Sequence, residues 1–256
     1  MNPPQSNGVP VSIRGLRKSF GRQEVLKGLE FDIRDGEIFV LMGPSGSGKS
    51  VFLRHLIGLE TPDAGEIRIG GELATNEGVG DRIRLAMVFQ SGGLLNSLTV
   101  AENVGLMLSE HRLKSPEEIQ RIVADRLALV RLGPEVASKL PSELSGGMRK
   151  RVAIARALVG DPQLILYDEP TSELDPMVAL TIGREINNLN HRIGATSVVV
   201  THDRDLAFGI ADRIGFLVNG TLVALGTPDE VRATRHPVLQ EFLAADFKRS
   251  SEAPSL

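Results

Sequence analysis

Eight consecutive residues, Gly43 to Ser50, have the types and spacing needed to bind a phosphate chain. They match the pattern G-x-x-x-x-G-K-[ST] at every fixed position. Glycines let backbone N–H groups approach phosphate oxygens without interference from a Cβ, and the following helix presents its positive end to the same anion. Lys49 can reach the β- and γ-phosphates of a nucleotide, and the Ser50 hydroxyl can ligate Mg²⁺. A plain Gly-rich turn is the alternative, and the loop alone does not separate kinases, GTPases and transport ATPases.

A pair of acids follows an apolar run later in the chain. Leu164–Tyr167 reads as a buried strand, and Asp168 and Glu169 come directly after it. Asp168 suits a water-mediated contact to Mg²⁺, and Glu169 can polarise an attacking water as a general base. The alternative is an acidic strand-to-turn junction, which Pro170 would end by forcing the chain out of the strand.

A second potential anion site lies at the start of a predicted helix. Ser145 is well placed as its N-cap, and Gly146 and Gly147 expose backbone donors at the positive end of the helix dipole. The sequence from Met148 onward has the composition of an amphipathic helix. By itself, the segment could equally be an ordinary capped helix.

The elements that must position these residues alternate short apolar runs with amphipathic stretches, which is typical of strands joined by helical crossovers. Ile38–Met42, Leu164–Tyr167 and Ser197–Val200 are predicted parallel strands, each ending at Gly43 or at a polar residue. The carboxyl ends of parallel strands line one crevice, so these ends should meet. Val11–Phe20 and Val25–Ile33 are predicted antiparallel strands around a turn at Gly21.

Between Leu94 and Gly160 the strand signal disappears, which predicts an inserted helical lobe. A helix should begin at Ser115, with Pro116 in the first position and two acids in the first turn, and should end near Gly133. We expect one domain over residues 11–236. Its core and β subdomain span 11–93 and 159–236, its helical subdomain spans 94–158, and residues 1–10 and 249–256 are flexible tails.

Composition limits the remaining possibilities. The 256 residues are 41% hydrophobic and 24% charged, with a formal net charge of −3, so no basic excess points to a nucleic-acid partner. The chain has no cysteine, which excludes disulfides and thiolate metal sites. The N-terminus lacks a signal-peptide layout, and no apolar run approaches the roughly 18 residues that span a bilayer. Any membrane role is therefore expected to need another protein.

The motifs together resemble those of the ABC (ATP-binding cassette) ATPases. Leu144–Met148 is similar to the family's signature LSGGQ, with Met148 in the last place. Further matches are Gln90 with the Q-loop glutamine, Ser172–Asp175 with the D-loop, His202 with the switch histidine and Phe20 with the aromatic that stacks on adenine. The resemblance implies an α/β fold: a P-loop NTPase (RecA-like) core with an antiparallel β subdomain and an inserted ABC helical subdomain.

The resemblance also implies the site, with ATP and Mg²⁺ as cofactors. Catalytic roles fall to Lys49, Gln90, Glu169 and His202, and Mg²⁺ ligation to Ser50, Gln90 and Asp168. Nucleotide contacts are implied for Phe20, Gly43, Pro44, Ser45, Gly46, Ser47, Gly48, Lys49, Ser50, Val51, Gln90, Asp175 and His202. In a head-to-tail dimer, Ser145, Gly146 and Gly147 of a second copy would complete each ATP site, and hydrolysis would loosen the pair and drive a permease.

Local features resemble one subgroup, the Mla-type (MlaF-like) phospholipid transport ATPases. They are Phe89–Leu95, Leu98–Val104 and Pro141–Arg151, with Met148 in the signature and Tyr167 before the acid pair. This implies a peripheral protein at the cytoplasmic face of the inner membrane, with a multi-spanning MlaE-like permease, an MCE-domain MlaD-like protein and a STAS-domain MlaB-like subunit as partners. Glu173 departs from the subgroup and brings charge to the D-loop.

Two alternatives have other cargoes or roles: an ATPase for a substrate such as amino acids, and an FtsE-like cell-division ATPase. A non-transport ABC protein of DNA repair or translation would need long insertions, cysteines or two cassettes. The signature helix and His202 argue against a simple P-loop kinase.

Overall fold

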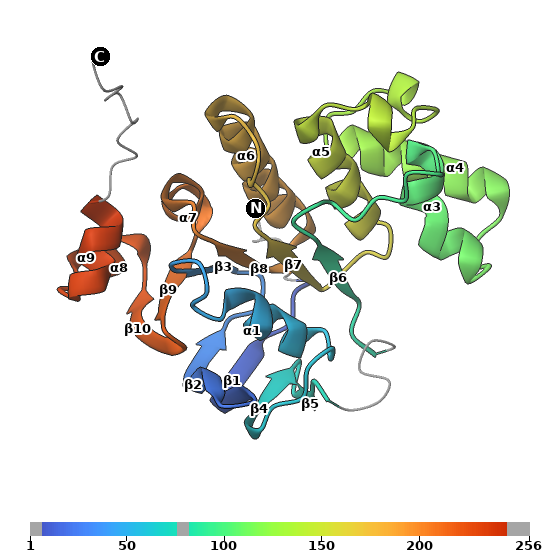
Figure 1. Cartoon of the computed structure of the whole chain (residues 1–256). Coiled ribbons are helices and arrows are strands. Elements are labelled where there is room, and N and C mark those ends of the chain that lie inside the picture. The colour runs from blue at the N-terminus through green and yellow to red at the C-terminus, as the bar shows by residue number, and fades with distance from the viewer. Residues whose placement is uncertain (1–6, 76–81, 245–256) are drawn as a thin grey trace, which may run out of the picture.

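The computed structural model describes residues 7–75 and 82–244 (Figure 1). The sequence-predicted tail at 249–256 and residues 1–6 lie outside this part. A four-stranded antiparallel sheet has the order β2-β1-β4-β5, formed by β1 (Val11–Phe20), β2 (Gln23–Ile33), β4 (Ala64–Ile69) and β5 (Glu72–Leu73). The predicted hairpin is confirmed, but β2 begins at Gln23 instead of Val25 because Gln23 pairs with Phe20 across the turn.

A six-stranded central sheet carries the predicted parallel strands. Its order is β10-β9-β3-β8-β7-β6, from β3 (Ile38–Met42), β6 (Leu85–Val88), β7 (Leu164–Asp168), β8 (Thr196–Thr201), β9 (Arg213–Val218) and β10 (Thr221–Gly226). All neighbouring pairs are parallel except β9 with β10. The order places β8 between β3 and β7, so the ends of three predicted strands lie side by side.

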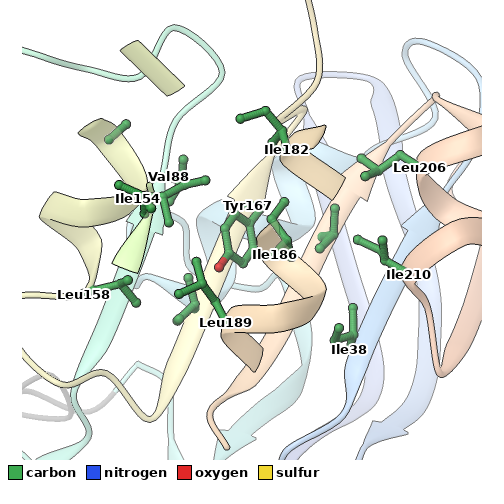
Figure 2. Close-up of a cluster of buried hydrophobic side chains, with 14 of the residues drawn as sticks. Ile38, Val88, Ile154, Leu158, Tyr167, Ile182, Ile186, Leu189, Leu206 and Ile210 are labelled. Atoms are coloured by element: carbon green, nitrogen blue, oxygen red, sulfur yellow. The ribbon is translucent and has the colours of Figure 1, made fainter. Parts of the chain in front are cut away.

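Strand β3 divides two hydrophobic cores by the period-two alternation of its side chains. Ile38, Val40 and Met42 face the core beneath α6 (Pro176–Ile193) and α7 (Arg204–Ile210). Figure 2 shows Tyr167 of β7 among Ile182, Ile186 and Leu189 of α6 in that core. Phe39 and Leu41 instead face α1 (Lys49–Leu56) and the antiparallel sheet, where Phe39 stacks on Phe31 with ring centroids 5.2 Å apart. Because every residue of β3 is buried on one side or the other, the strand is a rigid base for the loop at its carboxyl end.

The helical lobe occupies the green part of the chain in Figure 1. It contains α3 (Val100–Glu110), α4 (Pro116–Leu129), short 3₁₀ turns at Pro134–Val136 and Pro141–Glu143, and α5 (Gly146–Ala157). No strand occurs between β6 and β7, a stretch that the structure describes throughout, as predicted. The predicted helix start is confirmed: α4 begins with Pro116 in its first position, and Ser115 caps it in a capping box with Glu118. The helix ends at Leu129, earlier than expected, because Arg131 takes a left-handed conformation with φ 57°.

The chain packs against the domain beyond both of the expected bounds, residues 11 and 236. The backbone of Val9, assigned to the N-terminal tail, donates to the Thr196 hydroxyl at 3.0 Å and accepts from it at 2.8 Å. After α8 (Pro228–Ala233), the chain continues beyond residue 236 into α9 (Pro237–Ala244), whose Leu239 is fully buried. Phe242 of α9 lies 5.2 Å from Phe216. The packed unit therefore includes residues 7–10 and 237–244. Among residues 7–75 and 82–244, no helix combines the length and apolar character needed to cross a membrane.

Candidate functional site

The predicted phosphate loop connects β3 to α1 and forms one wall of a cleft of about 310 Å³. The cleft is lined by Val25, Ser45, Gly46, Gly48, Lys49, Ser50, Val51, Gln90, Glu169 and His202. Apart from Val25 of β2, these residues follow the carboxyl ends of four adjacent strands, because the order β3-β8-β7-β6 sets the loop, His202, Glu169 and Gln90 side by side. The prediction that strand ends meet in one crevice is confirmed.

Two glycines of the loop fit only without a side chain. A Cβ at Gly43 would lie 2.2 Å from the Leu217 carbonyl oxygen, so the loop runs against β9 there. Gly48 has φ 109°, a conformation that L side chains rarely adopt, and its Cβ would lie 2.8 Å from Leu26 Cδ2. Gly48 ends the loop and starts α1.

Helix α1 begins without a side-chain cap. An α-helix leaves the N–H groups of its first turn without intrahelical acceptors, and elsewhere Ser, Thr or Asp side chains bind such groups. Here Gly48 precedes the helix, and Lys49, Ser50 and Val51 line the cleft. This donor set, at the positive end of the helix dipole, fits the phosphates of a nucleotide.

The Lys49 ammonium lies within the loop, with the residue only 7% exposed. It donates to the carbonyl oxygens of Gly43 at 2.8 Å and Pro44 at 3.0 Å. Glu169 Oε1 lies 3.9 Å away from its Nζ. Burial lowers the pKa of Lys49, and the charges of Glu169 and Asp168 act in the opposite direction. The cation thus lies in the wall of the cleft, held there by carbonyl oxygens of the loop itself.

Ser50 and Asp168, both predicted to ligate Mg²⁺, contact each other. The Ser50 hydroxyl donates to Asp168 Oδ1 at 3.4 Å. Burial and then the neighbouring charge of Glu169 raise the pKa of Asp168, against the Ser50 hydrogen bond and the charges of Lys49 and Arg54. Within the described part of the chain, no cluster of three or more His, Cys, Asp or Glu side chains could hold a metal ion. Mg²⁺ here would therefore need phosphate and water oxygens in addition to Ser50, an arrangement that this ion favours.

The Glu169 carboxylate is held by three donors from the end of β8. Its Oε2 accepts from the Thr201 hydroxyl at 3.1 Å, from His202 N–H at 3.2 Å and from His202 Nδ1 at 2.9 Å. The backbone of Glu169 is left-handed, with φ 45°, so the chain already leaves the strand one residue before Pro170. A non-glycine residue in this conformation is uncommon and costs free energy, roughly 1–2 kcal/mol. The surrounding contacts therefore fix the carboxylate in the cleft.

Two contributors were not assigned from the sequence. Thr201 is fully buried and orients Glu169, and its position at a strand end beside His202 was a usable signal. Lys150 of α5 donates to the Gln90 carbonyl oxygen and contacts the Glu169 segment. Its signal was a lysine on the buried face of an amphipathic helix, since lysine is rarely buried without partners.

The remaining predicted residues lie outside the lining of the cleft. Phe20 is 43% exposed at the β1–β2 turn, with Lys18 Nζ 5.3 Å from its ring centroid. Ser145 caps α5 by accepting from Met148 N–H at 3.3 Å. A Cβ at Gly147 would lie 2.6 Å from Val178 Cγ1, so the start of α5 packs tightly on α6.

Asp175 also has a local structural partner. Its Oδ1 accepts from the backbone N–H groups of Met177 and Val178, both at 3.1 Å, and so caps α6. The signature segment, Phe20 and Asp175 thus do not join the cleft of their own chain.

Comparisons with known proteins agree with this geometry. Residues 26–172 match the family model described as ABC transporter. The chain is 42% identical over 240 residues to the "Probable ribonucleotide transport ATP-binding protein mkl" of Mycobacterium leprae, covering 92% of this chain and 69% of that protein. It is 39% identical over 254 residues to the "Protein TRIGALACTOSYLDIACYLGLYCEROL 3, chloroplastic" of Arabidopsis thaliana, covering 91% of this chain and 73% of the relative.

Solved structures give the same result. A dimeric post-hydrolysis state of the ATP-binding cassette MJ0796, bound to ADP and Pi, superposes with a TM-score of 0.76 at 34% identity. The match covers 85% of this chain and 98% of that one. The ABC cassette fold expected from the sequence is confirmed, and ATP and Mg²⁺ are the cofactors of such cassettes, which act as dimers with membrane permease components. The chain belongs to the ABC transporter family as an ATP-binding, ATP-hydrolysing subunit.

Proposed function

We propose that Glu169 is the general base of ATP hydrolysis and that His202 orients it. The observation that carries this is the carboxylate's fixed place in the cleft, 3.9 Å from Lys49 Nζ and bonded to His202 at 2.9 Å. A general base must lie within hydrogen-bond reach of the water that it activates, and a carboxylate beside the phosphate loop meets this condition. Gln90, which follows the neighbouring strand β6, lines the same cleft and would complete the ligands of Mg²⁺ with Ser50 and Asp168.

We propose the remaining nucleotide contacts on the same basis. The loop residues Gly43–Val51 would hold the phosphates, Phe20 would stack on the adenine, and Ser145–Gly147 of a second copy would close over the γ-phosphate. The uncapped start of α1 and the exposed Phe20 ring support the first two contacts. For Asp175 we propose an indirect role, because its carboxylate caps α6.

The test of the base is Glu169→Gln, which keeps the shape of the side chain. Removal of a general base is expected to lower kcat by roughly 10²–10⁴-fold. Binding of a fluorescent ATP analogue should persist, since the phosphate loop is unchanged. Glu117→Gln, which removes the same charge from the exposed first turn of α4, is the matched control and should hydrolyse ATP normally. Normal turnover in Glu169→Gln would refute the assignment.

We further propose that the transported cargo is a lipid, a phospholipid in the Mla-type arrangement. The segments Phe89–Leu95 and Pro141–Arg151 support this, as does the Arabidopsis relative, which has a glycolipid in its name. In this assembly the protein lies at the cytoplasmic face of the inner membrane, bound to an MlaE-like permease with MCE-domain and STAS-domain partners.

A different cargo is the competing candidate, because the mycobacterial relative is named for ribonucleotide transport. Affinity purification of the full chain from its own membranes tests both. Recovery of a multi-spanning permease with an MCE-domain protein and bound phospholipid supports the lipid proposal. Recovery of a permease for amino acids or nucleotides, or of a cell-division complex, contradicts it.

A further inference from the structure

Lys150 is a buried cation whose contacts converge from three separate segments. It lies on α5 of the helical lobe, and the residue is only 7% exposed. Its Nζ donates to the Gln90 carbonyl oxygen, to the Glu169 carbonyl oxygen at 3.5 Å and to the Ser172 hydroxyl at 3.3 Å. An ammonium has three N–H donors, so these acceptors use its full capacity.

No carboxylate touches this ammonium within the part of the chain that the structure describes. Burial lowers the pKa of Lys150, and the charges of Glu173, Glu169 and Asp168 raise it from a greater distance. A desolvated cation without a directly paired anion is costly, and good hydrogen-bond geometry must offset that cost. An apolar side chain at this position would pack α5 on the core without the cost of desolvating an ammonium, so packing alone does not explain the lysine.

The carbonyl oxygens that accept from the Lys150 ammonium belong to two residues of the site, Glu169 and Gln90. The Glu169 carbonyl oxygen also accepts from Ser172 N–H at 3.1 Å, so Lys150 adds a second donor to the peptide that follows the left-handed Glu169. Gln90 is held through its carbonyl oxygen, which leaves its side chain free to line the cleft. One ammonium therefore joins α5 to the backbones of two residues that follow adjacent strands and line the cleft.

We propose that Lys150 is a positioning residue for hydrolysis. It couples the position of the helical lobe to the Glu169 carboxylate and to Gln90, because its ammonium joins α5 to the backbones of both residues. This inference rests on the proposed role of Glu169 as the base. Lys150 itself does not line the cleft and is assigned no contact with the nucleotide.

The test compares Lys150→Met, Lys150→Gln and Lys150→Arg in the full chain. Misplacement of reacting groups by about 1 Å can lower turnover roughly 10²-fold, so the Met and Gln variants are expected to lose roughly 10–100-fold in kcat. Their KM for ATP and their affinity for a fluorescent ATP analogue should be unchanged, because the loop 43–50 is intact. Lys150→Arg keeps the charge and the donors and should retain most of the turnover.

Arg126→Met is the matched control. Arg126, on α4 of the same lobe, donates to the Leu158 carbonyl oxygen at 2.9 Å and pairs with Asp161 at 2.5 Å, away from the cleft. This variant should lower the Tm while leaving kcat unchanged. Lys150→Met should instead lower kcat more than Arg126→Met does, even where the two variants have the same Tm.

Three outcomes would overturn the inference. The first is a wild-type kcat in both Lys150→Met and Lys150→Gln. The second is a loss of kcat in Lys150→Arg as large as in those two variants. The third is a loss of kcat of that size in Arg126→Met. If Lys150→Met does not fold, the comparison of Lys150→Gln with Lys150→Arg decides. Glu169→Gln is measured in parallel. If this variant keeps its turnover, the role of Glu169 as the base is refuted. If it loses turnover while the Lys150 variants keep theirs, only the positioning role of Lys150 is refuted.

Discussion

Replacing Thr196 by valine should loosen the N-terminal segment from the central sheet and lower the stability of the whole chain. The Thr196 hydroxyl is fully buried at the start of β8, where it donates to the Val9 carbonyl oxygen at 2.8 Å. It also accepts from the N–H groups of Val9 and Gly36, both at 3.0 Å. Valine has nearly the same shape but leaves all three backbone groups without this partner.

The magnitude can be worked out from these three contacts. A typical hydrogen bond contributes about 1 kcal/mol net to stability, so the variant should lose about 3 kcal/mol. For a domain of this size, 1 kcal/mol corresponds to about 2–4 °C, which gives a fall in Tm of about 6–12 °C. If residues 7–10 detach, water can hydrogen-bond to the Val9 backbone groups and part of the loss in stability is recovered. We therefore expect a fall in Tm near the lower end of this range.

Thermal unfolding followed by far-UV circular dichroism measures the effect. Thr181→Val is the control for the substitution itself, since the Thr181 hydroxyl only donates to the Met177 carbonyl oxygen within α6. That variant should keep the Tm of the wild type. Equal Tm values for Thr196→Val and the wild type would refute the reasoning that these three bonds anchor residues 7–10.

Two predictions concern the site. Thr201→Val removes one of the three donors to the Glu169 carboxylate, so we expect kcat to fall roughly 3–10-fold with unchanged ATP affinity; unchanged kcat would show that the two His202 donors suffice. Asp168→Asn should raise the Tm of the nucleotide-free protein at neutral pH while abolishing Mg²⁺-dependent hydrolysis. Because burial and Glu169 raise the pKa of Asp168 in the folded state, that state binds the proton more tightly than the unfolded chain, and stability falls as the pH rises through the raised pKa. The gain in Tm should therefore shrink as the pH is lowered and Asp168 becomes protonated; a gain independent of pH, or no gain, would contradict this origin.

Local features of the fold could be predicted because their causes act over a few residues. The loop Gly43–Ser50 depends on glycines and a lysine at fixed spacing, and the start of α4 depends on Ser115 and the residues just after it. Buried strands such as β3 show as short apolar runs. The other strands, β4, β5, β6, β9 and β10, were not predicted, since their pairing depends on partners far along the chain.

The sequence by itself therefore determined the chemistry that the chain carries: a phosphate loop, an acid pair, a strand-end histidine and a capped signature helix. Only the tertiary structure decided which groups act on one another. The strand order β3-β8-β7 brings Lys49, which follows β3, and Thr201 and His202, at the end of β8, to the one carboxylate of Glu169, which follows β7. The packing of α5 brings Lys150 to Glu169. Such contacts join residues that are far apart along the chain, so no local spacing rule encodes them, and they form only when the sheet order and the helical lobe are in place.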